Sequence, residues 1–105
     1  MTDKRIVLST AGSEDEARRI ARHLVELQLA ACVNIVPQIE SVYHWQGRVE
    51  SNREWLLLIK TTAEKFPGVC SAIRELHSYE LPECISITVD DGSPQYLQWI
   101  SDAVR

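Results

Sequence analysis

The order of strand-like and helix-like segments predicts an α+β protein with a ferredoxin-like split β-α-β architecture. Two long segments carry apolar residues at helical spacing, and four others alternate or run apolar residues as strands do. Along the chain they follow the order strand–helix–strand–strand–helix–strand, with a short helix at the end. We therefore expect one domain over residues 1–105. It should consist of an antiparallel sheet with two helices packed on one face.

The first strand and the first helix are predicted at residues 5–10 and 14–28. Ser13 and Glu16 form a capping-box pattern, in which the Ser oxygen accepts an N–H of the first turn and the Glu side chain reaches back. Apolar residues then recur on one helical face, at Ala17, Ile20, Ala21 and Leu24. This face is expected to pack on the sheet.

A long β-hairpin is predicted from strands at residues 31–45 and 48–61, joined at Gln46 and Gly47. Pro37 cannot donate a ladder hydrogen bond, so it marks a bulge or an edge position. Each arm has about 14 residues and is longer than the first helix, because a strand rises roughly twice as far per residue. The overhanging part is apolar and would expose a sheet edge, so we expect other copies of the chain to cover it.

The second half of the chain predicts a helix, a strand and a helix. Residues 61–64 are a second capping-box candidate, and helical periodicity continues to Leu76. Pro67 is awkward inside this helix, so the first turn is expected to be irregular or to start later. Residues 84–89 alternate like a strand. Ser93, followed by a proline, is the expected N-cap of the C-terminal helix.

Composition excludes several classes of protein. A net charge of −4 without a Lys/Arg cluster argues against nucleic-acid binding. The longest apolar run, residues 55–59, is too short to cross a bilayer, and no signal peptide precedes the first strand, so we expect a cytoplasmic protein with no membrane association. The three cysteines, Cys32, Cys70 and Cys84, match no zinc or disulfide spacing and are expected to be small buried hydrophobes.

The segment ELHSYELPE, residues 75–83, gathers His77 and three glutamates. Imidazole and carboxylate ligands together suit Cu(II), Zn(II) or Ni(II), so a histidine among glutamates is a candidate metal site. Glu80 is close enough in sequence to bind the same ion or to orient the imidazole ring. The alternative is a structural histidine at a helix C-terminus, followed by a turn into the last strand. The sequence leaves both interpretations open.

No catalytic pattern accompanies these residues. The chain lacks a nucleophile elbow, a Gly-rich phosphate loop and an HExxH motif, so we expect neither enzymatic activity nor an organic cofactor. Tyr43 and Trp45, near the tip of the predicted hairpin, either pack in the structure or line a cleft between subunits.

Four segments in the same order resemble the CutA family of divalent-cation tolerance proteins. They are LAACVN at 29–34, SVYHWQG at 41–47, LIKTT at 58–62 and HSYELPE at 77–83. The resemblance covers nearly the whole chain and implies a ferredoxin-like fold and a tight homotrimer. It also implies a role in tolerance of copper and other divalent ions, with no agreed catalytic activity.

The resemblance further implies a metal site, which some family members build from a first-strand Cys with a His and a Glu of the loop. Ser9 occupies the first-strand position here, and its neutral hydroxyl is a poorer ligand than a thiolate. His77 and Glu83, with Glu80, are the ligands that remain for Cu(II) or a similar ion. The alternative function is a trimeric signalling or scaffold module that binds a small ligand or a partner protein at clefts between subunits.

Overall fold

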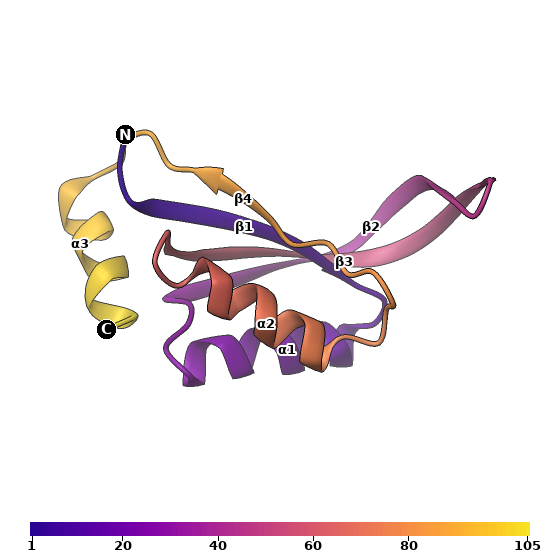
Figure 1. Ribbon diagram of the computed structural model, residues 1–105, viewed down its shortest axis with the longest axis horizontal. Coiled ribbons are helices and arrows are strands. Elements are labelled where there is room, and N and C mark those ends of the chain that lie inside the picture. The colour runs from indigo at the N-terminus through magenta and orange to yellow at the C-terminus, as the bar shows by residue number, and fades with distance from the viewer.

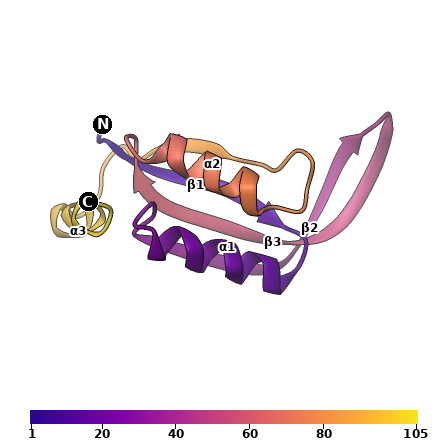
Figure 2. The same ribbon diagram turned by 60° about the horizontal axis from the view of Figure 1, so that its bottom comes forward.

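The computed structural model describes all 105 residues and confirms the predicted order of elements. The elements are β1 (Lys4–Ala11), α1 (Glu14–Glu26), β2 (Cys32–Trp45), β3 (Arg48–Thr62), α2 (Phe66–Leu76), β4 (Ile85–Thr88) and α3 (Pro94–Ala103). The strands form one antiparallel sheet in the order β2-β3-β1-β4. Helices α1 and α2 lie side by side on one face of the sheet, and α3 lies at the end away from the hairpin tip (Figures 1 and 2). The predicted α+β class and its ferredoxin-like layout are therefore confirmed.

The core lies between the sheet and the two long helices. Alternation along β1 and β3 turns Val7, Leu57 and Ile59 toward the helices, where each side chain is 0% exposed. The apolar stripe of α1 meets them with Ile20 and Leu24, as the periodicity predicted. A smaller cluster of Ala31, Ile100 and Val104 fastens α3 to the rest of the molecule.

The long hairpin bends at a bulge and then leaves the body of the molecule. The register between β2 and β3 shifts between Val36 and Ile39, and Gln38 takes a left-handed φ of 54°. The bulge expected at Pro37 is thus confirmed. Beyond it the two strands project past the ends of α1 and α2 (Figure 1), so the distal hairpin has no helix to cover it.

Two helix boundaries differ from the predicted ones. Thr61 pairs with Arg5 across the sheet, so the expected cap of α2 belongs to β3 and the helix begins later, at Phe66. Its Pro67 then falls in the first turn, where the missing N–H has no intrahelical partner to lose. Helix α1 ends at Glu26 because Gln28 adopts a φ of 58°.

The cysteines are less buried than the sequence predicted. Cys32, Cys70 and Cys84 are each half-buried free thiols, and Cys84 packs against the edge of the main core. No helix in the structure has the length and apolar character needed to cross a membrane.

Candidate functional site

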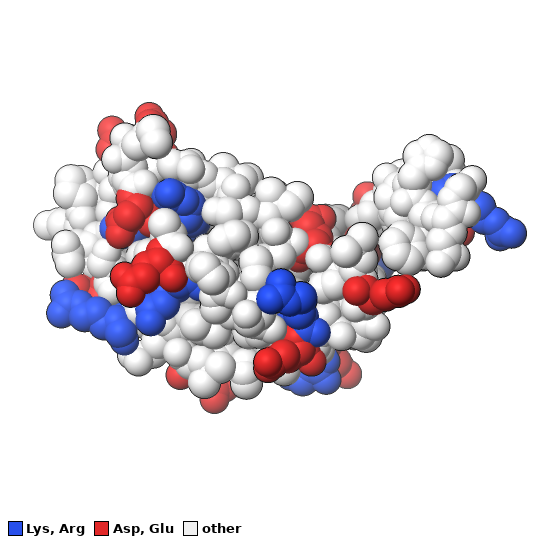
Figure 3. Space-filling view, viewed as in Figure 1, with Lys and Arg blue, Asp and Glu red and all other residues white.

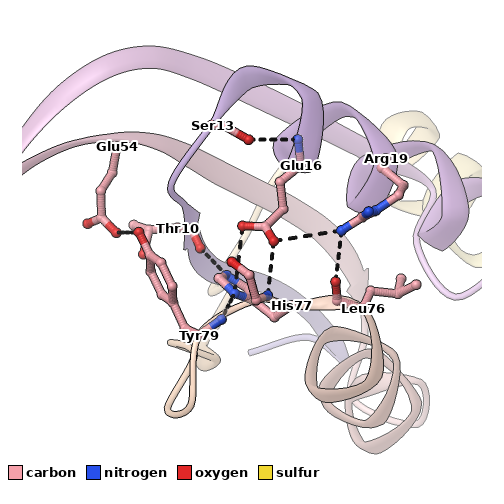
Figure 4. Close-up of polar contacts among 9 residues, drawn as sticks. Thr10, Ser13, Glu16, Arg19, Glu54, Leu76, His77 and Tyr79 are labelled. Atoms are coloured by element: carbon pink, nitrogen blue, oxygen red, sulfur yellow. Dashed lines mark hydrogen bonds and ion pairs between the residues drawn. The ribbon is translucent and has the colours of Figure 1, made fainter.

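His77, the residue that follows α2, has its side chain in the interior of the protein. That side chain is 0% exposed, and the backbone N–H ends the helix by donating to the Ile73 carbonyl at 2.9 Å. The ring Nε2 lies 2.6 Å from the Thr10 carbonyl oxygen, and Nδ1 lies 3.0 Å from the Tyr79 backbone nitrogen (Figure 4). Because a carbonyl only accepts and a backbone N–H only donates, the ring is the neutral tautomer with its proton on Nε2.

Glu16 on α1 closes the same region from the helix side. Its carboxylate accepts the Ser78 backbone N–H at 2.9 Å, and Arg19 donates to the Leu76 carbonyl at 3.0 Å. Burial alone would raise the pKa of the Glu16 carboxyl, but hydrogen bonding to Ser78 holds that pKa below its usual value. The structure shows one of the two hydrogen bonds of the expected capping box, in which Ser13 Oγ accepts the Glu16 N–H at 3.1 Å. We call residues 76–78 with Thr10, Glu16 and Arg19 the His77 corner.

Tyr79 connects the His77 corner to the hairpin. Its hydroxyl donates to the Glu54 carboxylate on β3 at 2.8 Å, and its ring centroid lies 4.5 Å from that of His77 (Figure 4). Gly12 makes room for this ring, because a Cβ there would lie 2.8 Å from the Tyr79 hydroxyl. Burial, and then the hydrogen bond to Glu54, raise the pKa of the Tyr79 hydroxyl well above its usual value, so it remains a donor.

An open cavity of about 700 Å³ lies beside Tyr79, between the hairpin and the segment that follows α2. It is lined by four carboxylates, those of Glu40, Glu54, Glu80 and Glu83. The aromatic rings of Tyr43 and Trp45 also line it, and no Lys, Arg or His side chain does. Acidic side chains can be seen where the hairpin leaves the body of the molecule (Figure 3). We call this space the acidic cavity.

Glu83 experiences the charge of its neighbour in the acidic cavity. Its pKa is raised, because burial disfavours the charged form and because the Glu54 carboxylate repels it. Glu54 is itself only 6% exposed, and the hydroxyl of Tyr79 is its hydrogen-bond donor. Since no basic side chain lines the cavity, a bound cation would relieve this repulsion.

The structure brings four of the five predicted site residues together and separates the fifth. Glu80, Glu83, Tyr43 and Trp45 all line the acidic cavity, whereas His77 does not. The structure does not support His77 as a metal ligand, because both of its ring nitrogens are hydrogen-bonded within the chain. Nor are any three His, Cys, Asp or Glu side chains of one chain grouped to hold a metal ion.

Ser9 lies in the core and not at the cavity. Its side chain is 0% exposed on β1, and its Oγ has no hydrogen-bond partner. The family resemblance implied that some members have a metal-binding cysteine at this position. In this chain the hydroxyl belongs to the packing between the sheet and the helices.

Glu40 and Glu54 are the site residues that the sequence did not reveal. Glu54 directly precedes the apolar run 55–59, and a carboxylate beside such a run is an unusual neighbour within one strand. That signal could have identified a buried carboxylate. Its proximity to Glu83 depends on the bend of the hairpin, which the local sequence does not specify.

Comparison with known proteins agrees with this architecture. The family model described as CutA1 divalent ion tolerance protein matches residues 5–103. A divalent-cation tolerance protein CutA from Thermus thermophilus is 46% identical over 97 residues, which is 92% of this chain and 94% of that protein. The chain spans about half the length of the mammalian relatives that it matches.

Solved structures show the same fold. CutA from Xylella fastidiosa superposes with a TM-score of 0.96 at 39% identity, covering 99% of this chain and all of that one. The periplasmic divalent cation tolerance protein CutA from Archaeoglobus fulgidus superposes with a TM-score of 0.94 at 39% identity, covering 97% and 99% of the two chains. With a family model over almost its whole length and relatives this similar, the chain belongs to the CutA1 divalent ion tolerance family.

Proposed function

We propose that this chain serves tolerance of divalent cations as a non-catalytic homotrimer that binds an ion such as Cu(II) at the acidic cavity. The observation that carries the proposal is the raised pKa of Glu83 beside Glu54, in a cavity without a basic side chain. A divalent ion at that place would replace repulsion between carboxylates by attraction to both. The family description and the relative from Thermus thermophilus, named for divalent-cation tolerance, support the same role.

The donor chemistry favours broad and weak binding. Carboxylate oxygens accept many divalent ions, and Cu(II) binds tightest among the first-row ions by intrinsic order. Because the His77 imidazole is already hydrogen-bonded, we expect little selectivity for copper over zinc. One chain does not group three ligands, so we expect a neighbouring copy in a trimer to add donors.

The sheet face away from the helices gives a physical reason for assembly. Val7 points toward the helices, so its neighbours Ile6 and Leu8 point away from them, in register with Ile87 and Ile85. These two isoleucines are 47% and 54% exposed. On one edge of the sheet, the 14-residue β2 also lacks a partner on its outer side. Two neighbouring copies would cover both the apolar face and the edge.

Sedimentation equilibrium tests the assembly. The expected particle has three times the 12.0 kDa mass of the chain, at protein concentrations of the order of micromolar. A monodisperse 12.0 kDa species under those conditions contradicts the homotrimer.

Calorimetric titration with Cu(II) and Zn(II) tests the site. We expect Glu83→Gln to weaken binding of both ions about tenfold, which corresponds to ~1.4 kcal/mol. Glu75→Gln is the matched control, because it removes the same charge from an exposed position on α2 outside the cavity. Equal affinities in wild type and Glu83→Gln would remove the acidic cavity as the site.

A second candidate function rests on the aromatic lining of the same cavity. Tyr43 and Trp45 stand beside the carboxylates, and aromatic faces with acidic groups suit an organic cation or a basic segment of a partner protein. In that case the chain is a trimeric signalling or scaffold module, and metal binding is incidental. No measurable heat with either metal ion would favour this alternative.

We also propose a cytoplasmic location, because an odd number of cysteines without a disulfide framework is usual in a reducing compartment. The relative from Archaeoglobus fulgidus is described as periplasmic, so fractionation of the producing cells is the direct test. Recovery of the protein only with the periplasmic fraction would contradict the proposal.

A further inference from the structure

Two thiols from separate elements meet beside the core. Cys70 belongs to α2 and Cys84 immediately precedes β4, and their sulfur atoms lie 2.7 Å apart. An S–S bond is about 2.05 Å long, so less than ~1 Å of approach separates this contact from a covalent bridge. Both residues are half-buried, which leaves a route for a small oxidant.

The segment between the two thiols contains the loop that lines one side of the acidic cavity. The chain leaves the end of α2 nearest the hairpin and turns back toward β4 (Figure 2). On the way it supplies Tyr79, Glu80 and Glu83 to the acidic cavity. A bond between residues 70 and 84 would therefore close a ring that contains this wall of the cavity.

We propose that Cys70 and Cys84 are a redox-active pair whose reversible disulfide ties α2 to β4 and fixes the loop that lines the acidic cavity. The oxidant is a small peroxide, and the reductant is a low-molecular-weight or protein dithiol. The pair forms its bond whether or not the cavity binds a cation, so this inference does not depend on the proposed function.

The chemistry balances with hydrogen peroxide as oxidant. The Cys70 thiolate attacks one peroxide oxygen and the O–O bond breaks. Hydroxide departs, and Cys70 becomes a sulfenic acid. The Cys84 sulfur then attacks the Cys70 sulfur, the S–O bond breaks, and water leaves as the S–S bond forms. Two thiols and one peroxide thus give one disulfide and two waters. A dithiol reverses the step with two electrons and two protons.

The surroundings assign different roles to the two sulfur atoms. Burial, then the hydrogen bond with Cys70, raise the pKa of the Cys84 thiol to about 12. Cys84 therefore keeps its proton, and we assign Cys70 as the sulfur that reacts first. A thiol with so high a pKa is a slow nucleophile toward free oxidants, but it attacks a sulfenic acid held next to it.

The test uses the whole wild-type protein, treated with equimolar hydrogen peroxide in the presence of a metal chelator. We expect titratable thiols to fall from the three of the reduced chain to one, and the intact mass to fall by two hydrogen atoms. A tryptic digest without reductant should join the peptides on either side of Arg74 through residues 70 and 84. Dithiol treatment should restore all three thiols.

Cys32→Ser is the matched control, because this thiol lies on β2 in a different part of the sheet and its loss should leave the bridge intact. Cys84→Ser should abolish the bridge. Three persistent thiols, a bridge between chains, or oxidation of Cys70 and Cys84 to sulfinic acids in the wild type would each overturn the proposal.

Hydrogen exchange tests the effect on the loop. The oxidised protein should protect the amides of residues 78–81 and 83 more strongly and unfold at least about 5 °C higher than the reduced form. A bridge that forms without changing exchange in this segment would overturn its role as a tether of the cavity wall.

Discussion

The His77 corner and the acidic cavity lie on either side of Tyr79, and they shift the pKa of a carboxyl group in opposite directions. In the corner, Glu16 and His77 are both hydrogen-bonded to backbone groups. In the cavity, the Glu54 carboxylate repels Glu83, and no basic side chain is among the lining residues. The pKa of Glu16 is accordingly lowered and that of Glu83 raised.

This difference separates a framework residue from a residue of the proposed ion site within seven residues of sequence. His77 joins α2 to β1 through the Thr10 carbonyl, which makes it part of the framework. The Glu54 carboxylate repels the charged form of Glu83, and a bound cation would relieve that repulsion. A histidine among glutamates is therefore weak support for a metal site until the partners of each ring nitrogen are known.

The largest expected effect comes from breaking the corner. His77→Ala leaves the Thr10 carbonyl and the Tyr79 N–H without partners and opens a hole in the interior, so the free energy of unfolding should fall by about 3 kcal/mol. Urea unfolding at fixed protein concentration measures it. A loss below about 1 kcal/mol would show that His77 is not part of the framework.

The next effect tests the ring that joins the two regions. Gly12→Ala places a methyl group 2.8 Å from the Tyr79 hydroxyl, and we expect a loss of about 2 kcal/mol from crowding. In the Tyr79→Phe background the hydroxyl is gone, so the same change should cost less. A double-mutant cycle by thermal unfolding measures this coupling, and strict additivity would contradict the close contact.

The two carboxyls should give opposite pH dependences. The folded-state pKa of Glu16 is lowered, so its contribution to stability is present above the ordinary pKa of 4.5 and is lost as pH falls through the folded pKa. That of Glu83 is raised, so its stabilising effect is present below 4.5 and is lost as pH rises through the folded pKa. Compared with wild type, Glu16→Gln should lower the free energy of unfolding at pH 7 by about 1–2 kcal/mol, and the thermal midpoint should fall with it. Glu83→Gln should leave that midpoint unchanged or raise it.

Measuring the midpoints between pH 3 and pH 7 at one protein concentration checks both signs, since assembly shifts apparent stability. Glu75→Gln serves again as the exposed control and should follow the wild-type curve. The same sign of change in Glu16→Gln and Glu83→Gln would remove the distinction between the two regions.

Local sequence signals predicted the elements well where one residue decides the local structure. Ser13 caps α1 and Pro37 marks the bulge, because capping and the missing N–H act within a few residues. The capping-box pattern that begins at Thr61 did not predict the start of α2, because Thr61 pairs with Arg5 of β1 and belongs to the sheet. The distinction between His77 and Glu83 was not predictable locally, because it depends on the Thr10 carbonyl, 67 residues away, and on Glu54 across the hairpin.

The smallest expected effect concerns Ser9, which neighbours Thr10 in β1. Unlike the polar groups of the His77 corner, its hydroxyl makes no hydrogen bond. Its Oγ is buried without a partner, so Ser9→Ala should stabilise the protein by about 1 kcal/mol. Thr61→Val is the matched comparison, because the equally buried Thr61 hydroxyl donates to the Leu29 carbonyl at 2.6 Å and its loss should destabilise by about 1–2 kcal/mol. Urea unfolding of both variants measures the difference. If both changes destabilise equally, the Ser9 hydroxyl has a partner in solution, and the position regains a claim to a polar role.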